Sequence, residues 1–340
     1  MTILVSGGAG YIGSHMVLEL LDRGERVVVL DDLSTGFWWA VPPEAVFVKG
    51  DIADQAFVAD VIAEHRITEI AHFAARIVVP DSIADPLGYY LANTVKTRSL
   101  LESAVRGGVM HVIFSSTAAV YGEPSVSPVP EDVALAPINP YGRSKLMSEW
   151  MLADVAAAHG VSYVALRYFN VAGADPRGRS GQSTHNATHL IKVACQAALG
   201  QRPGLDIFGT DYPTRDGTCV RDYIHVTDLA RAHLAALDHL RGGGVSLTLN
   251  CGYGRGYTVK QVADMVKLVS GVDFPVRHLP RRAGDPASIV ARADRIRAEL
   301  GWVPAHDDLR EIVRLALAWE QMLEHKNIGA ELRPETGEPK

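Results

Sequence analysis

The sequence predicts an α/β fold, in which a doubly wound parallel sheet is followed by a smaller C-terminal α/β lobe. Apolar runs rich in Val and Ile alternate with helical stretches through the first half, which is the pattern of a parallel sheet covered on both faces. The length of 340 residues also exceeds one average domain. We therefore expect a first domain over 1–170, joined by a segment near 221–240, then a second lobe over 171–330 and a tail over 331–340.

The first half is expected to contribute the strands of the sheet, each a short apolar run. They cover 2–6, 26–31, 46–48, 69–73, 111–114 and 163–166. The first helix carries Met16, Val17, Leu20 and Leu21 at helical spacing and is closed by Gly24. Later helices are expected over 55–64, 87–105 and 142–158. The polar stretch from about 327, which contains Pro and Gly, predicts a loose tail.

Composition and charge narrow the class of function. The net charge of −6 and the pI near 6.1 argue against a nucleic-acid-binding surface. The three cysteines are far apart and odd in number, which indicates a reduced compartment and no disulfide framework. A membrane span and a secretory signal are not expected, so the cytoplasm is the expected location. The 13 histidines show no metal-ligand spacing, so no metal is expected.

A glycine run lies between the first predicted strand and the first predicted helix. Gly8, Gly10 and Gly13 fit G-x-G-x-x-G, and Gly7, Gly10 and Gly13 fit G-x-x-G-x-x-G. Backbone N–H groups and a helix N-terminus at this place can bind a pyrophosphate. An ordinary tight turn is the alternative, but the strand and helix on either side favour a dinucleotide-binding Rossmann domain.

Carboxylates at strand ends indicate which dinucleotide is bound. Asp31 ends the second strand, where a carboxylate can accept the ribose hydroxyls of the adenosine and would repel a 2′-phosphate. NAD is therefore favoured over NADP. Asp32 is better explained as a solvated or turn residue, although it adjoins the same site. Asp51 follows the third strand and could contact adenine, or it could be the N-cap of the next helix.

Tyr141 and Lys145 lie four residues apart, so they share one face of a predicted helix. A cation beside a phenol lowers its pKa, which would allow Tyr141 to exchange a proton with a substrate hydroxyl near neutral pH. Ser115, Ser116 and Thr117 end a strand of the same domain, where sites form in open α/β sheets. These hydroxyls could instead bond only to backbone.

Five segments together resemble a known family. They cover 5–15, 114–122, 140–145, 166–174 and 216–226, and the last two are the specific ones. The chain resembles the extended short-chain dehydrogenases/reductases over nearly its whole length. Within them it is most similar to the UDP-glucose 4-epimerases, also called UDP-galactose 4-epimerases.

The resemblance implies that UDP-glucose and UDP-galactose are interconverted through a 4-keto sugar, with tightly bound NAD. Tyr141 would take the proton of the sugar 4-hydroxyl, Lys145 would lower the Tyr141 pKa and hold the nicotinamide ribose, and Thr117 would bond the reacting oxygen. Related dehydratases carry an Asp-Glu pair directly after the Ser/Thr position. Here Ala118 and Ala119 stand there, so elimination lacks its acid and its base.

The resemblance also implies binding residues and a homodimer. With the glycines, Asp31, Asp32 and Asp51, the cofactor residues would be Tyr11, Ile12, Ser34, Thr35, Gly36, Ile52, Phe73, Ala74, Ala75, Asn93, Ser115, Tyr141, Lys145 and Phe169. With Thr117 and Tyr141, the substrate residues would be Asn170, His189, Leu190, Asp206, Ile207, Phe208, Arg221, Arg282 and Asp285. The dimer would form through the helices over 87–105 and 142–158.

Two departures from the family pattern leave alternatives open. Many epimerases carry a Lys on an NAD ribose where this chain has Ile77, so cofactor retention is expected to be weaker unless Arg76 substitutes. Ile289 weakly disfavours N-acetylated sugars by its bulk. A 4-epimerase for UDP-xylose/UDP-arabinose or for UDP-N-acetylhexosamine is the first alternative, and a net dehydrogenase would need its cofactor to exchange. A nucleotide-sensing protein of this fold is less favoured, because such proteins usually lack the Tyr/Lys pair.

Overall fold

The computed structural model describes residues 1–185, 187–282 and 285–331, with side chains up to 323. Its centre is a sheet of seven parallel strands in the order β10-β6-β5-β4-β1-β2-β3. The strands are β1 (Thr2–Ser6), β2 (Arg26–Asp31), β3 (Val46–Lys49), β4 (Ile67–His72), β5 (His111–Ser115), β6 (Ser162–Tyr168) and β10 (Leu247–Cys251). The predicted α/β class is thus confirmed.

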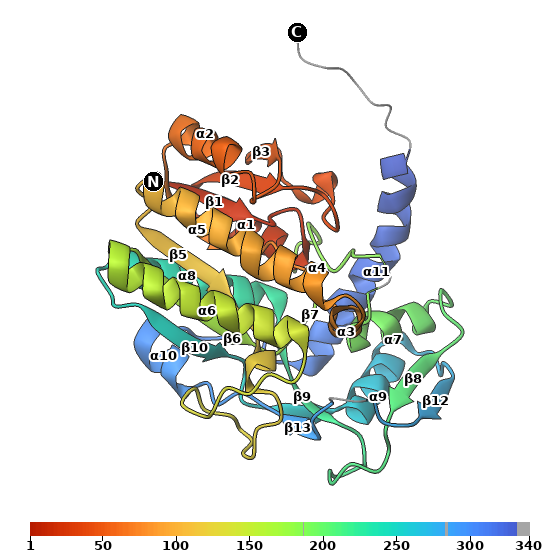
Figure 1. Cartoon of the computed structure of the whole chain (residues 1–340). Helices are drawn as coiled ribbons and strands as arrows, with labels where there is room; N and C mark the ends of the chain where they lie inside the picture. Colours follow the sequence, from red (N-terminus) through yellow and green to blue (C-terminus); the bar gives the residue numbers. More distant parts are fainter. Residues whose placement is uncertain (186, 283–284, 332–340) are drawn as a thin grey trace.

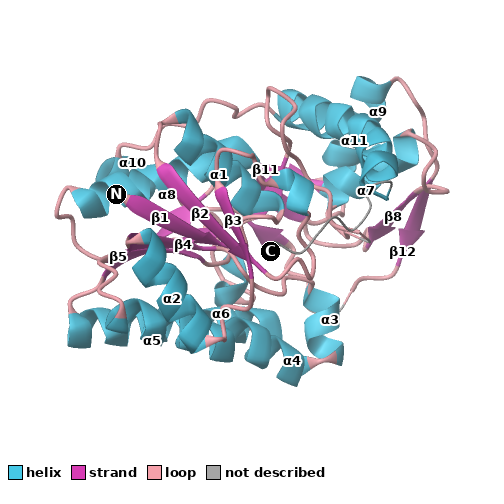
Figure 2. Cartoon of the chain, turned by 90° about the horizontal axis from the view of Figure 1, so that it is seen from above, coloured by secondary structure: helices cyan, strands magenta, loops and turns pink. Residues whose placement is uncertain are grey.

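Helices cover both faces of this sheet (Figures 1 and 2). One face carries α2 (Gln55–His65), α5 (Lys96–Arg106) and α6 (Pro140–His159), and the other carries α1 (Tyr11–Asp22) and α8 (Val226–Arg241). On β1, Leu4 packs into the core on the α2 and α5 side, while Ile3 and Val5 pack into the core beneath α1 and α8. This alternation explains why the strands read as continuous apolar runs.

The order of the strands reverses at β1, which lies between β4 and β2. From β1 the chain passes through α1 to β2, on one side of β1. It later returns to the sheet at β4, on the other side of β1. The N–H groups of Phe73 and Ala74 donate to the Ser6 carbonyl, at 2.8 and 3.1 Å. A crevice at such a switch point is where open α/β sheets bind ligands.

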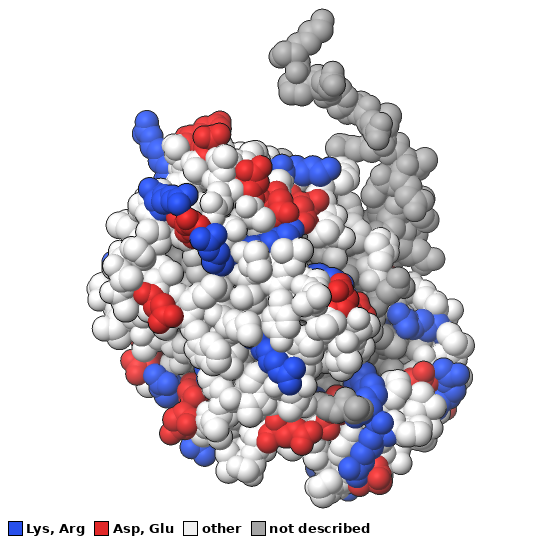
Figure 3. Space-filling view, viewed as in Figure 1, with Lys and Arg blue, Asp and Glu red and all other residues white. Residues whose placement is uncertain are grey.

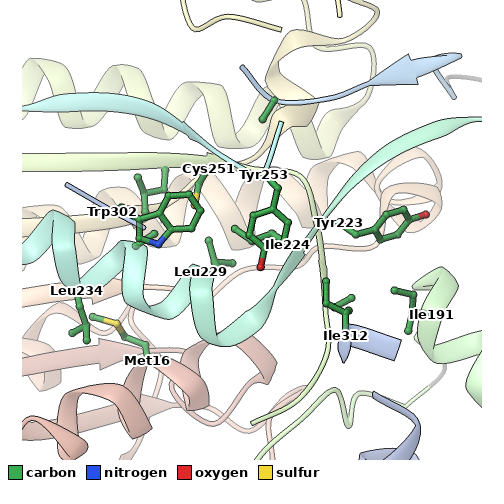
Figure 4. Close-up of a cluster of buried hydrophobic side chains, with 14 of the residues drawn as sticks. Met16, Ile191, Tyr223, Ile224, Leu229, Leu234, Cys251, Tyr253, Trp302 and Ile312 are labelled. Atoms are coloured by element: carbon green, nitrogen blue, oxygen red, sulfur yellow. The ribbon is translucent and has the colours of Figure 1, made fainter. Parts of the chain in front are cut away.

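The second lobe is built from short elements around β9 (Val220–His225). This strand pairs with β7 (Asn170–Ala172), β11 (Gly256–Thr258) and β13 (Ser288–Ile289), while β8 (Leu205–Phe208) and β12 (Val276–Leu279) form a separate pair. Helices α7 (Leu190–Ala198), α9 (Val259–Ser270) and α11 (Leu309–Glu331) pack together beside them, and α10 (Asp294–Leu300) packs near β10 and α8. Figure 4 shows one apolar core that joins the two parts, from Met16 and Leu229 through Ile224 to Ile312 and Ile191.

The structure corrects several predicted boundaries. The predicted helix over 87–105 is divided into α4 (Pro86–Tyr90), a π-helical segment η2 (Leu91–Val95) and α5, and the short helix α3 (Val79–Ala84) precedes it. Helix α6 begins two residues early because the Asn139 side chain caps it, accepting from the Gly142 N–H at 2.8 Å. Gly24 takes the left-handed conformation just beyond the C-cap Arg23.

Two longer-range predictions also need correction or remain open. Strand β10 (Leu247–Cys251) adds a seventh strand that the sequence analysis missed, so the chain returns to this sheet after the second lobe has begun. The expected tail from about 327 is wrong up to Glu331, because α11 continues to that residue and Pro334 lies beyond it. Residues 332–340 lie outside the described residues, and the division into domains stays a prediction. No helix among the described residues is long and apolar enough to cross a bilayer.

Candidate active site

The glycine turn between β1 and α1 is closely packed. Gly7 has φ +74°, and a Cβ there would lie 2.5 Å from the backbone nitrogen of Ala74. A Cβ at Gly13 would lie 2.1 Å from the Gly7 carbonyl oxygen. Gly10 is the N-cap of α1. The spacing that starts at Gly7 is therefore the one the backbone requires, and it places a helix N-terminus over the end of β1.

Asp31 is buried at the end of β2 beside this turn. Its carboxylate accepts from the N–H groups of Ala9 at 2.9 Å and Leu33 at 2.8 Å, and burial raises its pKa. Asp32 is exposed and accepts from the Ser34 N–H, which is the turn role expected for it. Gly36 is needed because a Cβ there would lie 2.9 Å from the Ala9 backbone. The loop after β2, with Ser34 and Thr35, thus lies against the glycine turn.

Asp51 lies after β3 and pairs with Lys96 at 2.5 Å, while its other oxygen accepts from the Ala53 N–H at 2.9 Å. The alternative that Asp51 caps α2 is wrong, because Asp54 accepts from the Phe57 N–H at 3.1 Å in that position. The neighbouring Ile52 is buried in the apolar core. Contact between Asp51 and adenine stays a prediction.

The loop after β4 is held by Asn93 of the π-helical segment. The Asn93 amide exchanges hydrogen bonds with the backbone N–H and carbonyl of Arg76, at 2.8 and 2.9 Å, and also reaches Ser144 Oγ at 3.0 Å. The structure therefore shows Asn93 positioning the segment of Phe73, Ala74 and Ala75. Arg76 points toward α4, where it pairs with Asp85 at 2.7 Å and lies over the Tyr89 ring.

The three predicted catalytic residues meet where β5 ends and α6 begins. Lys145 Nζ donates to the Ser115 carbonyl at 2.9 Å and lies 4.9 Å from the centroid of the Phe114 ring. Thr117 accepts from the Ala119 N–H at 3.1 Å and shares a hydrogen bond with the Tyr141 hydroxyl. All three side chains are buried. The structure thus places Thr117 beside Tyr141 and Lys145 against the end of β5, and the catalytic roles of the three residues stay a prediction.

The protonation of this group differs from the prediction. We expected a lowered pKa for Tyr141, but burial raises it to about 12, against a lowering by the Thr117 hydrogen bond. Burial lowers the pKa of Lys145 to about 7. The predicted direction of the Tyr141 pKa was wrong because helical spacing shows that Tyr141 and Lys145 share a helix face, but it does not show that burial removes solvent from both groups.

Tyr168 is a neighbour that sequence reasoning did not single out. Its hydroxyl bonds to Ser115 Oγ, and it lies near Tyr141 at the end of β6. The next residue, Phe169, packs against the adjoining apolar clusters. The motif over 166–174 contained this signal, since Tyr168 directly precedes Phe169 and Asn170.

Four of the predicted substrate residues form one cluster in the second lobe. Asp285 pairs with Arg282 at 2.9 Å and lies 3.7 Å from Arg221, and the Arg282 guanidinium lies 4.7 Å from the centroid of the Phe208 ring. Arg221 also donates to the carbonyls of Val220 and Pro286. Two guanidinium groups and an aromatic face suit a nucleotide diphosphate.

Asp206 and Ile207, the two predicted substrate residues that precede Phe208, have other partners in the second lobe. Asp206 pairs with the exposed Arg277 at 2.7 Å, and Ile207 is buried in the core. Their predicted contact with substrate is therefore less direct than that of Phe208, which follows them.

A pocket adjoins the cluster through β7 and β9. It contains the predicted Asn170, His189 and Leu190, and burial lowers the pKa of His189 to about 4, so His189 is neutral and can donate or accept a hydrogen bond. Sequence reasoning missed most of the remaining lining. The missed residues include Gln182, Lys192, Tyr223, Trp319 and Glu320, whereas Tyr11, which also lines the pocket, was predicted as a cofactor residue.

Residues of α11 reach both the pocket and the cofactor loop. The Trp319 ring lies 6.2 Å from Trp39, Trp39 lies 5.1 Å from Phe37, and Phe37 lies 5.3 Å from His185. Trp319 also donates to Ser183 Oγ at 3.2 Å. We call Phe37, Trp39, His185 and Trp319 the aromatic bridge, because it joins the loop after β2 to the second lobe. Three adjacent aromatic residues at 37–39 were a signal that sequence reasoning passed over.

Comparisons with known proteins agree with this geometry. Residues 3–252 match the NAD dependent epimerase/dehydratase family. A UDP-glucose 4-epimerase of Azospirillum brasilense is 58% identical over 95% of this chain and 92% of its own length. The crystal structure of UDP-glucose 4-epimerase from Brucella ovis in complex with NAD superposes with a TM-score of 0.91, at 45% identity over 93% of this chain and 97% of that one.

A third relative was solved with a sugar nucleotide. The UDP-glucose 4-epimerase from Stenotrophomonas maltophila, with bound NAD and formylated UDP-arabinopyranose, gives a TM-score of 0.93 at 40% identity, over 96% of this chain and 99% of that chain. Identity and coverage of this extent identify the family. The chain belongs to the UDP-glucose 4-epimerases of the NAD dependent epimerase/dehydratase family.

Proposed function

We propose that this chain interconverts UDP-glucose and UDP-galactose by inverting the configuration at C4, with bound NAD. The observation that carries the proposal is the joining of Thr117, Tyr141 and Lys145 at the switch-point edge of the sheet. Ala118 and Ala119 follow directly, and their methyl groups cannot transfer protons to or from C5 and C6. Redox chemistry at one carbon, without elimination, is what this set of side chains supports.

The residues present fit NAD. The glycine turn leaves room where a Cβ at Gly7 or Gly13 would collide with backbone, so a pyrophosphate can approach the N-terminus of α1. Asp31 would bind the adenosine ribose, and Lys145 the nicotinamide ribose. When bound, NAD would supply reversible hydride acceptance: the sugar is oxidised at C4 to the 4-keto form and then reduced again, so a full turnover has no net oxidation. The oxidised nicotinamide ring would add a positive charge to the site.

Each catalytic side chain has a distinct task in this proposal. Tyr141 removes the proton from the 4-hydroxyl and returns it after the sugar has turned. Thr117 hydrogen-bonds the Tyr141 hydroxyl and would also bond the reacting oxygen, while its own oxygen accepts from the Ala119 N–H. Lys145 supplies positive charge beside the phenol, which favours the phenolate. The substrate diphosphate would be bound by Arg221 and Arg282, after they exchange part of their pairing with Asp285.

A UDP-pentose is the second candidate substrate. The Stenotrophomonas relative binds a UDP-arabinopyranose derivative, and a pentose has one hydroxymethyl group fewer to accommodate. N-acetylated sugars are less favoured, because Ile289 is buried against the cluster of Ala118, Tyr121 and Leu146 beside the catalytic hydroxyls. Replacing Ile289 by Ala should therefore raise turnover of the N-acetylated substrate relative to UDP-galactose.

The test is a direct assay of 4-epimer formation. Purified protein is given UDP-galactose, UDP-arabinopyranose or UDP-N-acetylgalactosamine without added NAD, and nucleotide released by acid is identified. We expect conversion of UDP-galactose to UDP-glucose by the NAD that co-purifies. Conversion only with added NAD would show the weak retention expected from Ile77. Conversion of none of these sugars, even with NAD added, would overturn the proposal.

A homodimer is also proposed, through the surface of α4, η2 and α6. Leu87 is 78% exposed and Trp150 is 57% exposed, and Leu91, Val95 and Met147 are exposed beside them. Figure 3 shows few charged side chains across this face. Replacing Leu87 by Lys and Trp150 by Glu should convert a dimer to a monomer in light scattering; an unchanged mass would contradict this surface. The cytoplasm remains the expected location, in keeping with three free, buried cysteines.

A further inference from the structure

Ser115, Ser116 and Thr117, at and just after the end of β5, each contact one side chain on the same face of α6. Ser115 accepts from Lys145 through its carbonyl at 2.9 Å, and Thr117 bonds Tyr141 through its hydroxyl. Between them, Ser116 Oγ donates to Glu149 Oε1 at 2.5 Å. Glu149 lies one helical turn beyond Lys145, as Lys145 lies one turn beyond Tyr141. Of the three α6 side chains that contact this segment, Glu149 is the one that has no task in the proposed chemistry.

Glu149 is fixed on its other side by a buried ion pair. Arg167 of β6 donates to both carboxylate oxygens, at 3.0 and 2.6 Å, and both side chains are 6% exposed. Arg167 also donates to the Tyr121 hydroxyl at 3.1 Å, which donates to Asn250 at 2.7 Å. A buried pair of this kind often adds little net stability, so stability alone does not explain it. Its position behind Lys145 suggests a function.

We propose that Glu149 is a positioning residue for the reaction, which fixes Lys145 against the end of β5 and keeps that lysine charged beside Tyr141. The proposal rests on the proposed 4-epimerase function. Glu149 would act through Lys145 and Tyr141, without touching the sugar nucleotide.

The charges around Lys145 support this role. Burial lowers its pKa to about 7, and the Glu149 carboxylate acts against that lowering. The neutral His72, whose own pKa is lowered to about 3 by burial and by Lys145, faces the lysine from β4. Other titratable or charged groups of this region are Tyr89 of α4, Tyr121 of η3 (Ala118–Tyr121), Glu131 of the following loop, Tyr141 of α6, Arg167 and Tyr168 of β6, and Cys251 of β10. Without Glu149, Lys145 would lose its proton at a lower pH.

The chain contains a matched pair far from the site. Arg241 donates to both oxygens of the buried Glu69, at 2.8 and 2.7 Å. Glu69 lies level with His111 at the start of β5, whereas the catalytic residues lie at its other end. Replacing Glu69 by Gln therefore removes a buried carboxylate from a guanidinium without affecting the charge near Lys145, although Arg241 keeps its pair with Glu25 at 2.6 Å.

The experiment compares pH profiles of kcat and of KM for UDP-galactose in the NAD-containing enzyme. For Glu149→Gln we expect the alkaline fall in kcat to move to lower pH by about one unit or more, with KM within about twofold of wild type. Glu149→Asp, which keeps the charge, should restore part of the shift. Glu69→Gln should leave the profile in place.

A second variant separates positioning from folding. Glu149→Leu with Arg167→Met replaces the buried pair by apolar groups, which removes the uncompensated arginine that could prevent Glu149→Gln from folding. Its thermal midpoint should match that of Glu69→Gln or exceed it, while its alkaline limb stays shifted. An alkaline limb that coincides with wild type in either Glu149 variant, or an equal shift in Glu69→Gln, would overturn the proposal. Absence of epimerisation by the wild type would instead refute the proposed function.

Discussion

The catalytic half and the substrate half of the site are built differently. Thr117 follows the end of β5, Tyr141 and Lys145 lie on the long helix α6, and all three side chains are buried with hydrogen bonds in place. Arg282 and Asp285 belong to a connecting segment of the second lobe, and the Arg282 side chain is 49% exposed. Asp285 neutralises the charge of Arg282, and the substrate diphosphate must partly displace Asp285 to bind this guanidinium. The proton-transfer groups are therefore preorganised, whereas diphosphate recognition requires charges to change partners.

The largest effect is expected at the catalytic half. Tyr141→Phe removes only a buried hydroxyl, so the fold should persist while kcat falls by about 10³-fold or more. Turnover of UDP-galactose and circular dichroism of the same sample measure the two effects. Residual activity within about tenfold of wild type would show that another group removes the proton.

The buried lysine should make stability depend on pH. Burial lowers the pKa of Lys145 from its ordinary value of 10.5 to about 7, so this lysine carries fewer protons in the folded chain than in the unfolded chain between these limits. The free energy of unfolding should therefore rise as pH increases from about 7 to 10.5. Below this range, the full cost of burying the charged lysine is present. Lys145→Met should remove the effect, which is on the order of a few kcal/mol.

Urea unfolding of NAD-depleted protein at pH 6 and pH 9.5 measures this difference. Lys145→Met should stabilise the protein more at pH 6 than at pH 9.5. Arg282→Met is the control from the exposed half, and it should show no such dependence. Equal effects of Lys145→Met at both pH values would contradict a lowered pKa for this lysine.

The substrate half should respond in KM. Arg221→Met removes a largely buried guanidinium from the diphosphate site, so we expect KM to rise by about 10- to 100-fold. Arg282→Met should raise KM less, because this guanidinium is half exposed and screened by solvent. Steady-state kinetics with UDP-galactose give both values. A loss in kcat with unchanged KM would place these arginines in the chemical step instead.

The smallest effect is expected where the two halves meet. The aromatic bridge joins the cofactor loop to α11, and it offers a contact that could offset the lysine missing at Ile77. Trp319→Leu should release NAD about 3- to 10-fold faster, as measured from the nucleotide retained after gel filtration. Phe47→Leu on the edge strand β3 is the control. An unchanged release rate would show that the aromatic bridge does not contribute to NAD retention.

The same contrast explains what could be predicted from the sequence. The Gly7 turn joins β1 directly to α1, and Asp31 and the Tyr141/Lys145 pair lie within regular elements, so their spacing along the chain reports their position. The raised pKa of Tyr141 could not be read in this way, since it depends on burial by segments that are distant along the chain. Trp319 and Glu320 reach the pocket from α11, and their helix shows only an amphipathic pattern in the sequence. Ser116 appeared only as one of three hydroxyls, because its partner Glu149 is 33 residues away.

The central claim is that Tyr141 and its neighbours oxidise and re-reduce one carbon without exchange with solvent. Converting UDP-galactose that carries deuterium at C4 tests this most directly. We predict UDP-glucose that retains the deuterium at C4 under NMR and mass spectrometry, with no free NADH released. Loss of the label to water, or release of NADH in proportion to product, would contradict the account.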